Sequence, residues 1–340
     1  MQINKNELML ALETVKPGLA SKEVISQATS FAFIKGRVTT YNDEISISHP
    51  IAGLNIEGAI KAEILYALLG KIKKDEIDIS INENENEILI KAGKAKAGLT
   101  LISEITLPLD SIAEHGKWKS LPDNFIDALA FVVGSAGKDM SRPILTSVHV
   151  NKEGWIEASD ANRISKYTIS PMPISTVLIP ATSCSAIIKL QPTKVAEGPG
   201  WVHFKTEEGT ELSCRIFEDD VFPDVPGLFV VKGAGVTLPK KLEEVLSKAT
   251  IFSKRDHALD EFITLDLKEN SLKIRSNRET EGWFEEKLNI EYLGTPLHFS
   301  VSPYALKEIL KESLSCVISE DKMKFEGENW VYVSSLTAEE

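Results

Sequence analysis

The chain has 340 residues, 43% of them hydrophobic and 26% charged, and its formal net charge at pH 7 is −12. This composition excludes a disordered or fibrous protein and is typical of a soluble globular one. The negative charge weighs against a nucleic-acid binder, because phosphate contacts need Lys and Arg, unless the basic residues gather on one face.

The amino terminus and the cysteines indicate a cytoplasmic protein. Residues 1–12 lack a basic region followed by an apolar core, and the longest apolar stretch, 126–133, is too short to cross a bilayer. The three cysteines stand singly without CxxC spacing, which indicates reduced thiols in a reducing compartment. We expect no contact with a membrane.

Amphipathic helices and alternating strands follow one another along the whole chain. Apolar residues at helical spacing predict helices over 5–15, 61–72, 123–134, 181–190, 240–253 and 303–312. Alternation of apolar and polar residues predicts strands that include 77–81, 87–91, 201–205, 211–217 and 321–333. Hairpin turns are expected at 35–36, 152–154 and 269–270.

One unit occurs three times in the sequence. Strand-like stretches that end in small polar clusters are 118 residues apart, at Val38, Ile156 and Ile274. The helices that open each third are 117 residues apart, at Leu8, Phe125 and Leu242. We therefore predict an α+β protein of three repeated β-rich domains with two helices each, over 1–115, 116–233 and 234–340. The linkers between them are expected at 110–119 and 226–236.

Patterns that carry catalysis or hold a cofactor do not occur in the sequence. The six histidines have no partner at metal or triad spacing. Segment 134–138 resembles a phosphate loop only loosely, because its glycine spacing is wrong and Asp139 stands where Ser or Thr should hold magnesium. We predict a protein without enzymatic activity, metal or cofactor.

Basic residues recur on or beside the predicted helices in every third of the chain. The same pattern is common on the solvated face of any amphipathic helix, and glutamates on these helices dilute it. The pattern by itself does not distinguish a binding surface from a solvated face.

Several segments resemble the bacterial DNA polymerase III beta subunits, the sliding clamps. Segments 141–145 (SRPIL), 159–164 (SDANRI), 215–224 (RIFEDDVFPD) and 299–304 (FSVSPY) are similar to the family's R-P-[VI]-L, T-D-G-H-R-L, R-L-I-x-G-x-F-P-D-Y and F-N-V-x-Y. The similarity runs along the whole chain in the family's order. Ala161 and Asn162 replace the family's Gly and His, and 334–340 replaces its M-P-M-R-L ending. The shorter chain is typical of a divergent member, such as one encoded by a bacteriophage.

The resemblance implies a ring in which helices line a pore and sheets form the outer wall. Helices spaced about 10 Å apart enclose a clear bore of about 9 Å when six stand in a circle and about 28 Å when twelve do. A DNA duplex is about 20 Å wide, so two chains are required. The implied protein is a homodimeric processivity factor that encircles double-stranded DNA without reading its sequence. It would bind a DNA polymerase and an ATP-driven clamp loader through short linear peptides.

The resemblance also implies three sets of site residues. Pore contacts with DNA are expected from Lys22, Lys71, Lys73, Lys74, Lys138, Arg142, Lys189, Lys194, Lys240, Lys254, Arg255 and Lys307. A partner-peptide groove is expected from Leu145, Arg163, Ile164, Pro223, Leu228, Tyr304, Val333 and Leu336. Ile251 and Phe252 are expected at the dimer interface. Core packing is the alternative for these apolar residues. The alternative function is an interaction scaffold that keeps the fold but no longer encircles DNA.

Overall fold

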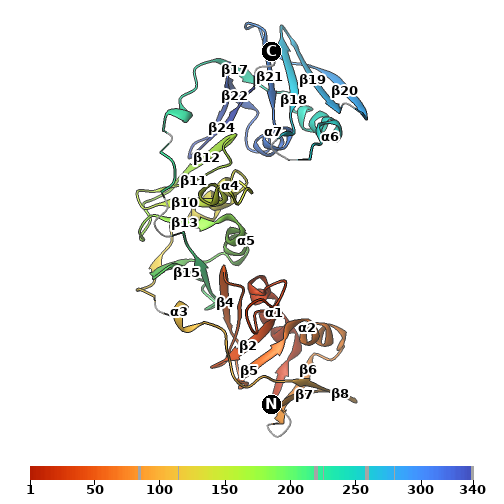
Figure 1. Cartoon of the computed structure of the whole chain (residues 1–340), viewed down its shortest axis with the longest axis vertical. Coiled ribbons are helices and arrows are strands. Elements are labelled where there is room, and N and C mark those ends of the chain that lie inside the picture. The colour runs from red at the N-terminus through yellow and green to blue at the C-terminus, as the bar shows by residue number, and fades with distance from the viewer. Residues whose placement is uncertain are drawn as a thin grey trace. The chain divides into compact units, whose positions relative to one another are not determined.

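A computed structural model describes residues 1–82, 86–113, 115–217, 221–224, 226–256, 260–278 and 280–337. Residue 114 of the first predicted linker, 218–220 of the motif at 215–224 and 338–340 of the tail lie outside these ranges. Contacts divide the chain into two compact units, 1–126 with 172–219, and 127–171 with 220–340 (Figure 1). Within the described ranges, no helix is long and apolar enough to cross a membrane.

The first unit contains two antiparallel sheets. The longer sheet has the order β5 (Gly58–Lys61), β2 (Ser30–Ile34), β3 (Arg37–Tyr41), β4 (Ile45–Pro50), β16 (Glu211–Arg215), β15 (Trp201–Lys205), β14 (Lys194–Gly198) and β9 (Lys119–Ser120). The shorter sheet has the order β1 (Gln2–Asn4), β6 (Glu76–Asn82), β7 (Glu87–Ala92) and β8 (Ala95–Thr100). The unit also contains α1 (Lys5–Val15), α2 (Ala62–Lys71), α3 (Asp110–Ala113), β13 (Val177–Pro180) and α5 (Ala181–Leu190). Helix α4 (Phe125–Val133) begins in this unit and continues in the second.

The second unit follows the same plan. The strands of its longer sheet that belong to this unit run in the order β10 (Ser147–Asn151), β11 (Trp155–Ser159), β12 (Arg163–Thr168), β24 (Trp330–Ser335), β23 (Lys322–Glu326), β22 (Ser315–Ile318) and β17 (Ala234–Thr237). Its shorter sheet runs β20 (Gly282–Asn289), β19 (Ser271–Arg278), β18 (Ile263–Lys268) and β21 (Leu297–Val301). The helices of this unit are α6 (Leu242–Ser253), α7 (Pro303–Ile309) and the short 3-10 turns η3 (Pro143–Thr146) and η4 (Pro226–Phe229).

The threefold repeat is confirmed by strand pairing. Val38, Ile156 and Ile274 are fully buried in β3, β11 and β19. Each of the three strands stands between an earlier and a later antiparallel neighbour: β2 and β4, β10 and β12, β18 and β20. Helices α1 and α6 pack on the equivalent strands β3 and β4, and β19 and β20. The positions of the domain boundaries, near 116 and 234, remain predictions, because strands of the middle repeat belong to both compact units.

Local sequence accounts for most element boundaries. Helix α1 begins where the Asn4 side chain accepts hydrogen bonds from the backbone N–H groups of Asn6 and Glu7, at 2.9 and 3.2 Å. The predicted hairpin turns are confirmed, with a positive φ at Lys35, Gly154 and Asn270. The expected strand over 321–333 is wrong in one respect. It is two strands, β23 and β24, joined by a turn that the Gly327 N–H closes on the Trp330 carbonyl.

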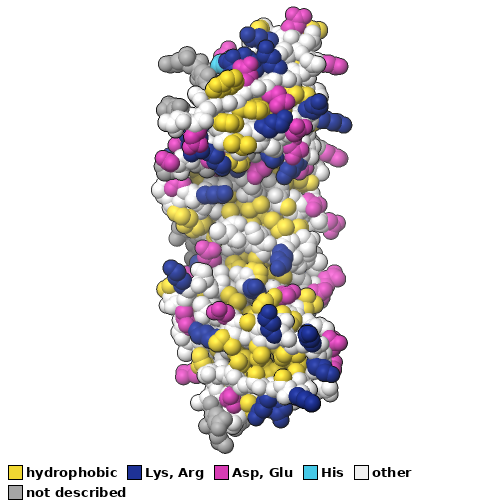
Figure 2. Space-filling view, turned by 90° about the vertical axis from the view of Figure 1, so that its right-hand side faces the viewer, with side chains coloured by type: hydrophobic (Ala, Val, Ile, Leu, Met, Phe, Trp, Pro, Cys, Tyr) yellow, Lys and Arg dark blue, Asp and Glu magenta, His cyan; other side chains and the backbone are white. Residues whose placement is uncertain are grey.

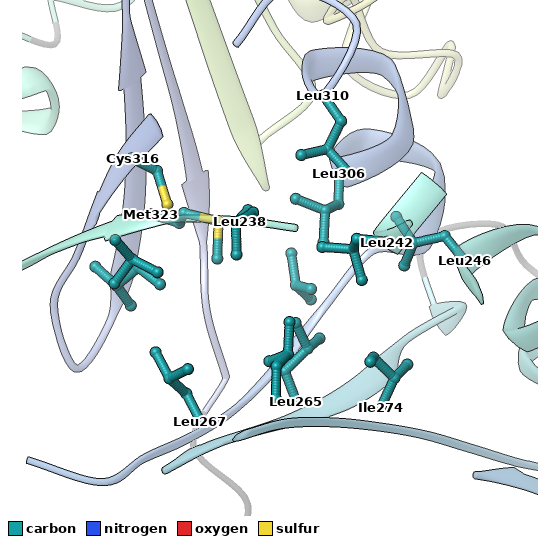
Figure 3. Close-up of a cluster of buried hydrophobic side chains, with 14 of the residues drawn as sticks. Leu238, Leu242, Leu246, Leu265, Leu267, Ile274, Leu306, Leu310, Cys316 and Met323 are labelled. Carbon is teal, nitrogen blue, oxygen red and sulfur yellow. The ribbon is translucent and has the colours of Figure 1, made fainter. Parts of the chain in front are cut away.

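The core of the third repeat lies between its helices and sheets. Leu242 of α6, Leu306 of α7 and Leu265 of β18 are buried in one hydrophobic cluster (Figure 3). Burial of a side chain of this size stabilises the folded state by about 1.5–3 kcal/mol relative to leaving it exposed. This cluster holds α6 and α7 in place, so the positions of the residues at their ends follow from it.

Both predicted linkers, together with the residues just before them, cover side chains of the longer sheets. In the first unit, Ile112 of the linker and Leu107, which precedes it, pack with Trp201 of β15 in a small apolar cluster. In the second unit, Phe222, which precedes the linker, stacks on His149 of β10 with ring centroids 5.0 Å apart. The linkers are therefore ordered straps with short elements of their own, α3 and β9 in one and η4 and β17 in the other.

Candidate functional site

The twelve residues expected to contact DNA lie mostly on the surface. Eleven of them are exposed, and Lys307 is half-buried. Lys71, Lys189 and Lys307 belong to α2, α5 and α7, and most of the others are in adjoining turns. Figure 2 shows, in each unit, Lys and Arg side chains on the helix-bearing side among acidic and hydrophobic ones. This surface is mixed in charge, although its basic residues are accessible.

Three cations of the third repeat have partners within the chain. The Lys254 ammonium lies 3.6 Å from the carboxylate of Glu261 and 4.8 Å from the centre of the Tyr304 ring. Arg255 donates hydrogen bonds to the backbone carbonyls of Lys254 and Asn277, and Lys307 donates one to the Ser247 hydroxyl at 2.8 Å. These contacts compete with phosphate binding, because an engaged cation must give up a partner first.

The residues expected in the peptide groove all lie in the second unit, and the structure separates them by depth. Ile164 and Val333 are buried, and they are directly paired neighbours on β12 and β24. Leu336 is also buried and belongs to the core cluster of the third repeat. The remaining apolar members are accessible or partly so: Leu145 in η3, Pro223, Leu228 in η4 and Tyr304 at the start of α7.

Arg163 is the most heavily bonded of the predicted groove residues. Its guanidinium donates to Asp160 at 2.9 Å, to Glu308 of α7 at 2.6 Å and to the Gly134 carbonyl at the end of α4. Burial opposes its charge, but the neighbouring Tyr332, Asp160 and Glu308 outweigh burial and raise the pKa of Arg163. The guanidinium therefore braces the second repeat against the third.

A cavity of about 260 Å³ opens beside this brace, between α4 and α7. Phe131 and Ile309 supply apolar walls, and Glu308 and Glu312 supply carboxylates. Tyr332 forms another part of its lining, and burial raises the pKa of this phenol, which stays un-ionised. None of the residues predicted for the groove lines this cavity.

The residues expected at the dimer interface lie beside an exposed tryptophan. Ile251 on α6 is 63% exposed, and Phe252 stacks on Phe284 of β20. Trp283, the neighbour of Phe284 along β20, is 72% exposed. Sequence reasoning missed Trp283, although two adjacent aromatic residues directly before a run of charged ones were the available signal.

Two strand edges complete the set of candidate surfaces. β8 and β20 each end a four-stranded sheet, and in the described part of the chain no further strand pairs with them. Such an edge offers a row of backbone N–H and C=O groups to another strand.

Comparisons with known proteins agree with this architecture. The sequence is 24% identical to the beta sliding clamp of Buchnera aphidicola over 292 residues, which cover 80% of this chain and 75% of that protein. No family model matches the sequence. The fold is similar to the DNA polymerase III beta chain of Streptococcus pneumoniae, at 20% identity, 99% coverage of both chains and a TM-score of 0.84. It is also similar to the sliding clamp of Pseudomonas aeruginosa bound to griselimycin, at 18% identity, 99% coverage of both chains and a TM-score of 0.81. The chain therefore has the fold of the bacterial beta sliding clamps and is a divergent relative of them in sequence.

Proposed function

We propose that this chain is a DNA polymerase processivity factor, two copies of which close into a ring around duplex DNA. The observation that carries the proposal is the pairing pattern of equivalent strands in the three repeats. The names of its relatives, which are DNA polymerase sliding clamps and beta subunits, support the same function.

Two of the three possible joints between repeats are made within the chain. β4 of the first repeat pairs with β16 of the second, and β12 of the second pairs with β24 of the third. β20 is the equivalent of β4 and β12, and β8 is the equivalent of β16 and β24. The missing joint is therefore β20 with β8, and a second copy of the chain supplies it. Two copies joined head to tail make two such joints and close a ring.

Side chains at the two edges favour this pairing. Lys96 lies in β8 and Lys94 beside it, whereas Glu285 and Glu286 lie in β20, where they also pair with Arg275 and Lys248 of the same chain. Opposite charges across a joint select the correct partner edge and speed the encounter. The exposed Trp283 adds a large apolar contact, which is typical of residues that dominate interface energies.

The ring would hold DNA by enclosure and by diffuse contacts with phosphates. Contacts to the backbone alone carry no sequence information, and their strength falls as salt rises. The carboxylates among the helix lysines weaken the attraction further. Weak, salt-sensitive binding allows the ring to slide, because no single sequence holds it.

The polymerase and the clamp loader would bind through short peptides at the predicted groove. Its accessible apolar residues, Leu228, Pro223 and Tyr304, would contact peptide side chains above the buried pair Ile164 and Val333. Arg163 supports this surface through its brace to α7 rather than through a direct bond to the peptide. Griselimycin, which is bound in the Pseudomonas aeruginosa clamp structure, is a suitable probe of this groove.

Retention on circular DNA tests the enclosure. Subunits that are dissociated by dilution and reassociated in the presence of a nicked plasmid should remain with the plasmid during gel filtration. Cutting the plasmid once should release them, because a ring slides off a free end. Equal retention before and after the cut, or a failure to bind either form, would contradict the ring and favour the interaction scaffold. The net charge of −12 is the observation that favours that second candidate.

A further inference from the structure

We propose that Lys254 is a positioning residue of the partner-peptide groove, which holds the Tyr304 ring in place and is itself anchored by Glu261. This inference rests on the proposed function, because it assigns a role within the groove. It also removes Lys254 from the residues that contact DNA.

Three segments meet at this cluster. Lys254 directly follows the last residue of α6, Tyr304 is in the first turn of α7, and Glu261 precedes β18. The beginning of α7 is itself defined, since the Ser302 side chain caps the helix by accepting from the Ala305 N–H. The backbone positions of Lys254 and Tyr304 are therefore set by the helices that carry them.

Glu261 is the anchor of the cluster. The residue is 4% exposed, and its Oε2 atom has no hydrogen-bond donor among the described residues. A buried carboxylate without compensation is strongly unfavourable. The Lys254 ammonium, 3.6 Å from Oε2, is the positive charge that forms an ion pair with it in the described chain. This ion pair therefore favours the observed position of the ammonium over one extended into solvent.

The same ammonium faces the aromatic ring of Tyr304. Its distance from the ring centre, 4.8 Å, is within the range of a cation–π interaction. A hydrogen bond with Tyr304, followed by the charge of Glu261, raises the pKa of Lys254, so the group stays protonated. Tyr304 is 36% exposed, and this contact limits the rotamers of an otherwise mobile surface ring.

A ring that is held before binding costs less entropy to immobilise when a peptide arrives. The contribution of Lys254 is therefore made through Tyr304 and disappears when Tyr304 is removed. An ammonium shared between a buried carboxylate and a ring is also poorly placed to contact a phosphate. These two consequences distinguish positioning from DNA binding.

The experiment compares single and double variants of the full chain with griselimycin as the groove ligand. Lys254→Met keeps the length of the side chain and removes its charge, and we expect the affinity for griselimycin to fall about 3- to 10-fold. Lys254→Arg restores a cation and should bind within about twofold of the native chain. Glu261→Gln should weaken binding in the same direction as Lys254→Met. The double variant K254M/Y304A should bind no more weakly than Y304A alone.

Lys240→Met is the matched control, because Lys240 is an exposed lysine just before α6. It should lower the salt dependence of the affinity for linear duplex DNA and leave griselimycin affinity unchanged. Lys254→Met should leave that salt dependence unchanged and lower griselimycin affinity. A native affinity in Lys254→Met together with a weakened Tyr304→Ala would overturn the positioning role alone. No binding by the native chain, or native affinity in Tyr304→Ala, would instead overturn the groove itself.

Discussion

Ala161 shows at the level of one residue how this chain departs from its relatives. It has a φ of +76°, in the left-handed region that glycine adopts at little cost. The equivalent residue of the first repeat, Asp43, has a φ of +77°, and aspartate tolerates this region better than alanine does. The turn persists at Ala161 because the Asp160 carboxylate accepts hydrogen bonds from the backbone N–H groups of Asn162 and Arg163.

Replacement of Ala161 by glycine should therefore stabilise the protein. The removal of left-handed strain outweighs the added freedom of the unfolded chain, and we expect the free energy of unfolding to rise by about 0.5–1 kcal/mol. Urea denaturation at pH 7 measures this change. Ala52→Gly is the control, since Ala52 is exposed and has no positive φ, and this variant should lose stability. A loss of equal size in both variants would contradict the strain.

At the scale of elements, the first linker between repeats covers a buried histidine of the longer sheet. The first linker places the His115 ring over His203 of β15, with centroids 5.2 Å apart. His203 is buried beneath it and shares a hydrogen bond of 2.8 Å with the Ser213 hydroxyl. Its buried imidazole makes this strap sensitive to acid.

Stability should fall as pH drops below 6.5 because of His203. Burial, and secondly the charge of His115, hold its pKa at about 4, while Glu211 opposes the shift. In the unfolded chain the pKa returns to about 6.5, so the unfolded state binds more protons between pH 4 and 6.5. The sign of the linkage is a loss of stability on acidification, of about 2 kcal/mol by pH 5 from this group. Urea midpoints from pH 7.5 to 5 should fall less steeply for His203→Gln, and equal slopes would rule out this histidine as the cause.

The assembly is the property of the whole molecule that the proposed function requires. Each of the two compact units contains a longer sheet that joins strands of two repeats. The four-stranded sheets at the two ends of the chain stop at β8 and β20. In the proposed ring, β20 of one copy pairs with β8 of another and so completes the third joint, since exposed strand edges favour such pairing.

Trp283→Glu should dissociate the ring without unfolding the subunit. The exposed indole contributes little to the fold of one chain, but its replacement by a charged side chain removes the large apolar contact of the proposed joint and takes a charge out of water there. We expect the dimer dissociation constant to rise at least about 10-fold. Light scattering at micromolar concentration should give about 75 kDa for the native chain, twice the mass of 37.5 kDa, and a lower value for the variant. Val24→Glu, at another highly exposed apolar residue, should keep the native mass. A native mass for Trp283→Glu would remove Trp283 from the joint.

The repeat and the helices could be predicted because their signal is local. The helices at 5–15 and 181–190 have the predicted bounds, since apolar residues at every third or fourth position show which face is buried. The turn within 321–333 was missed although Gly327 and Asn329 interrupt the strand pattern, which is the usual signal for a turn. Sequence reasoning predicted Arg163 as a groove residue, but it could not identify Glu308, 145 positions later, as its hydrogen-bond partner.

The amino-acid sequence by itself determined that one β-rich, two-helix unit occurs three times, because periodicity along a chain reports directly which side chains are buried. Only the tertiary structure decided which charged residues are engaged and which strand edges are open. Lys240 and Lys254 are both lysines that flank α6. Only the structure shows that Lys254 lies beside a buried carboxylate and an aromatic ring that come from other segments of the chain. Side-chain partners of this kind depend on how separate elements pack, and no local pattern encodes them.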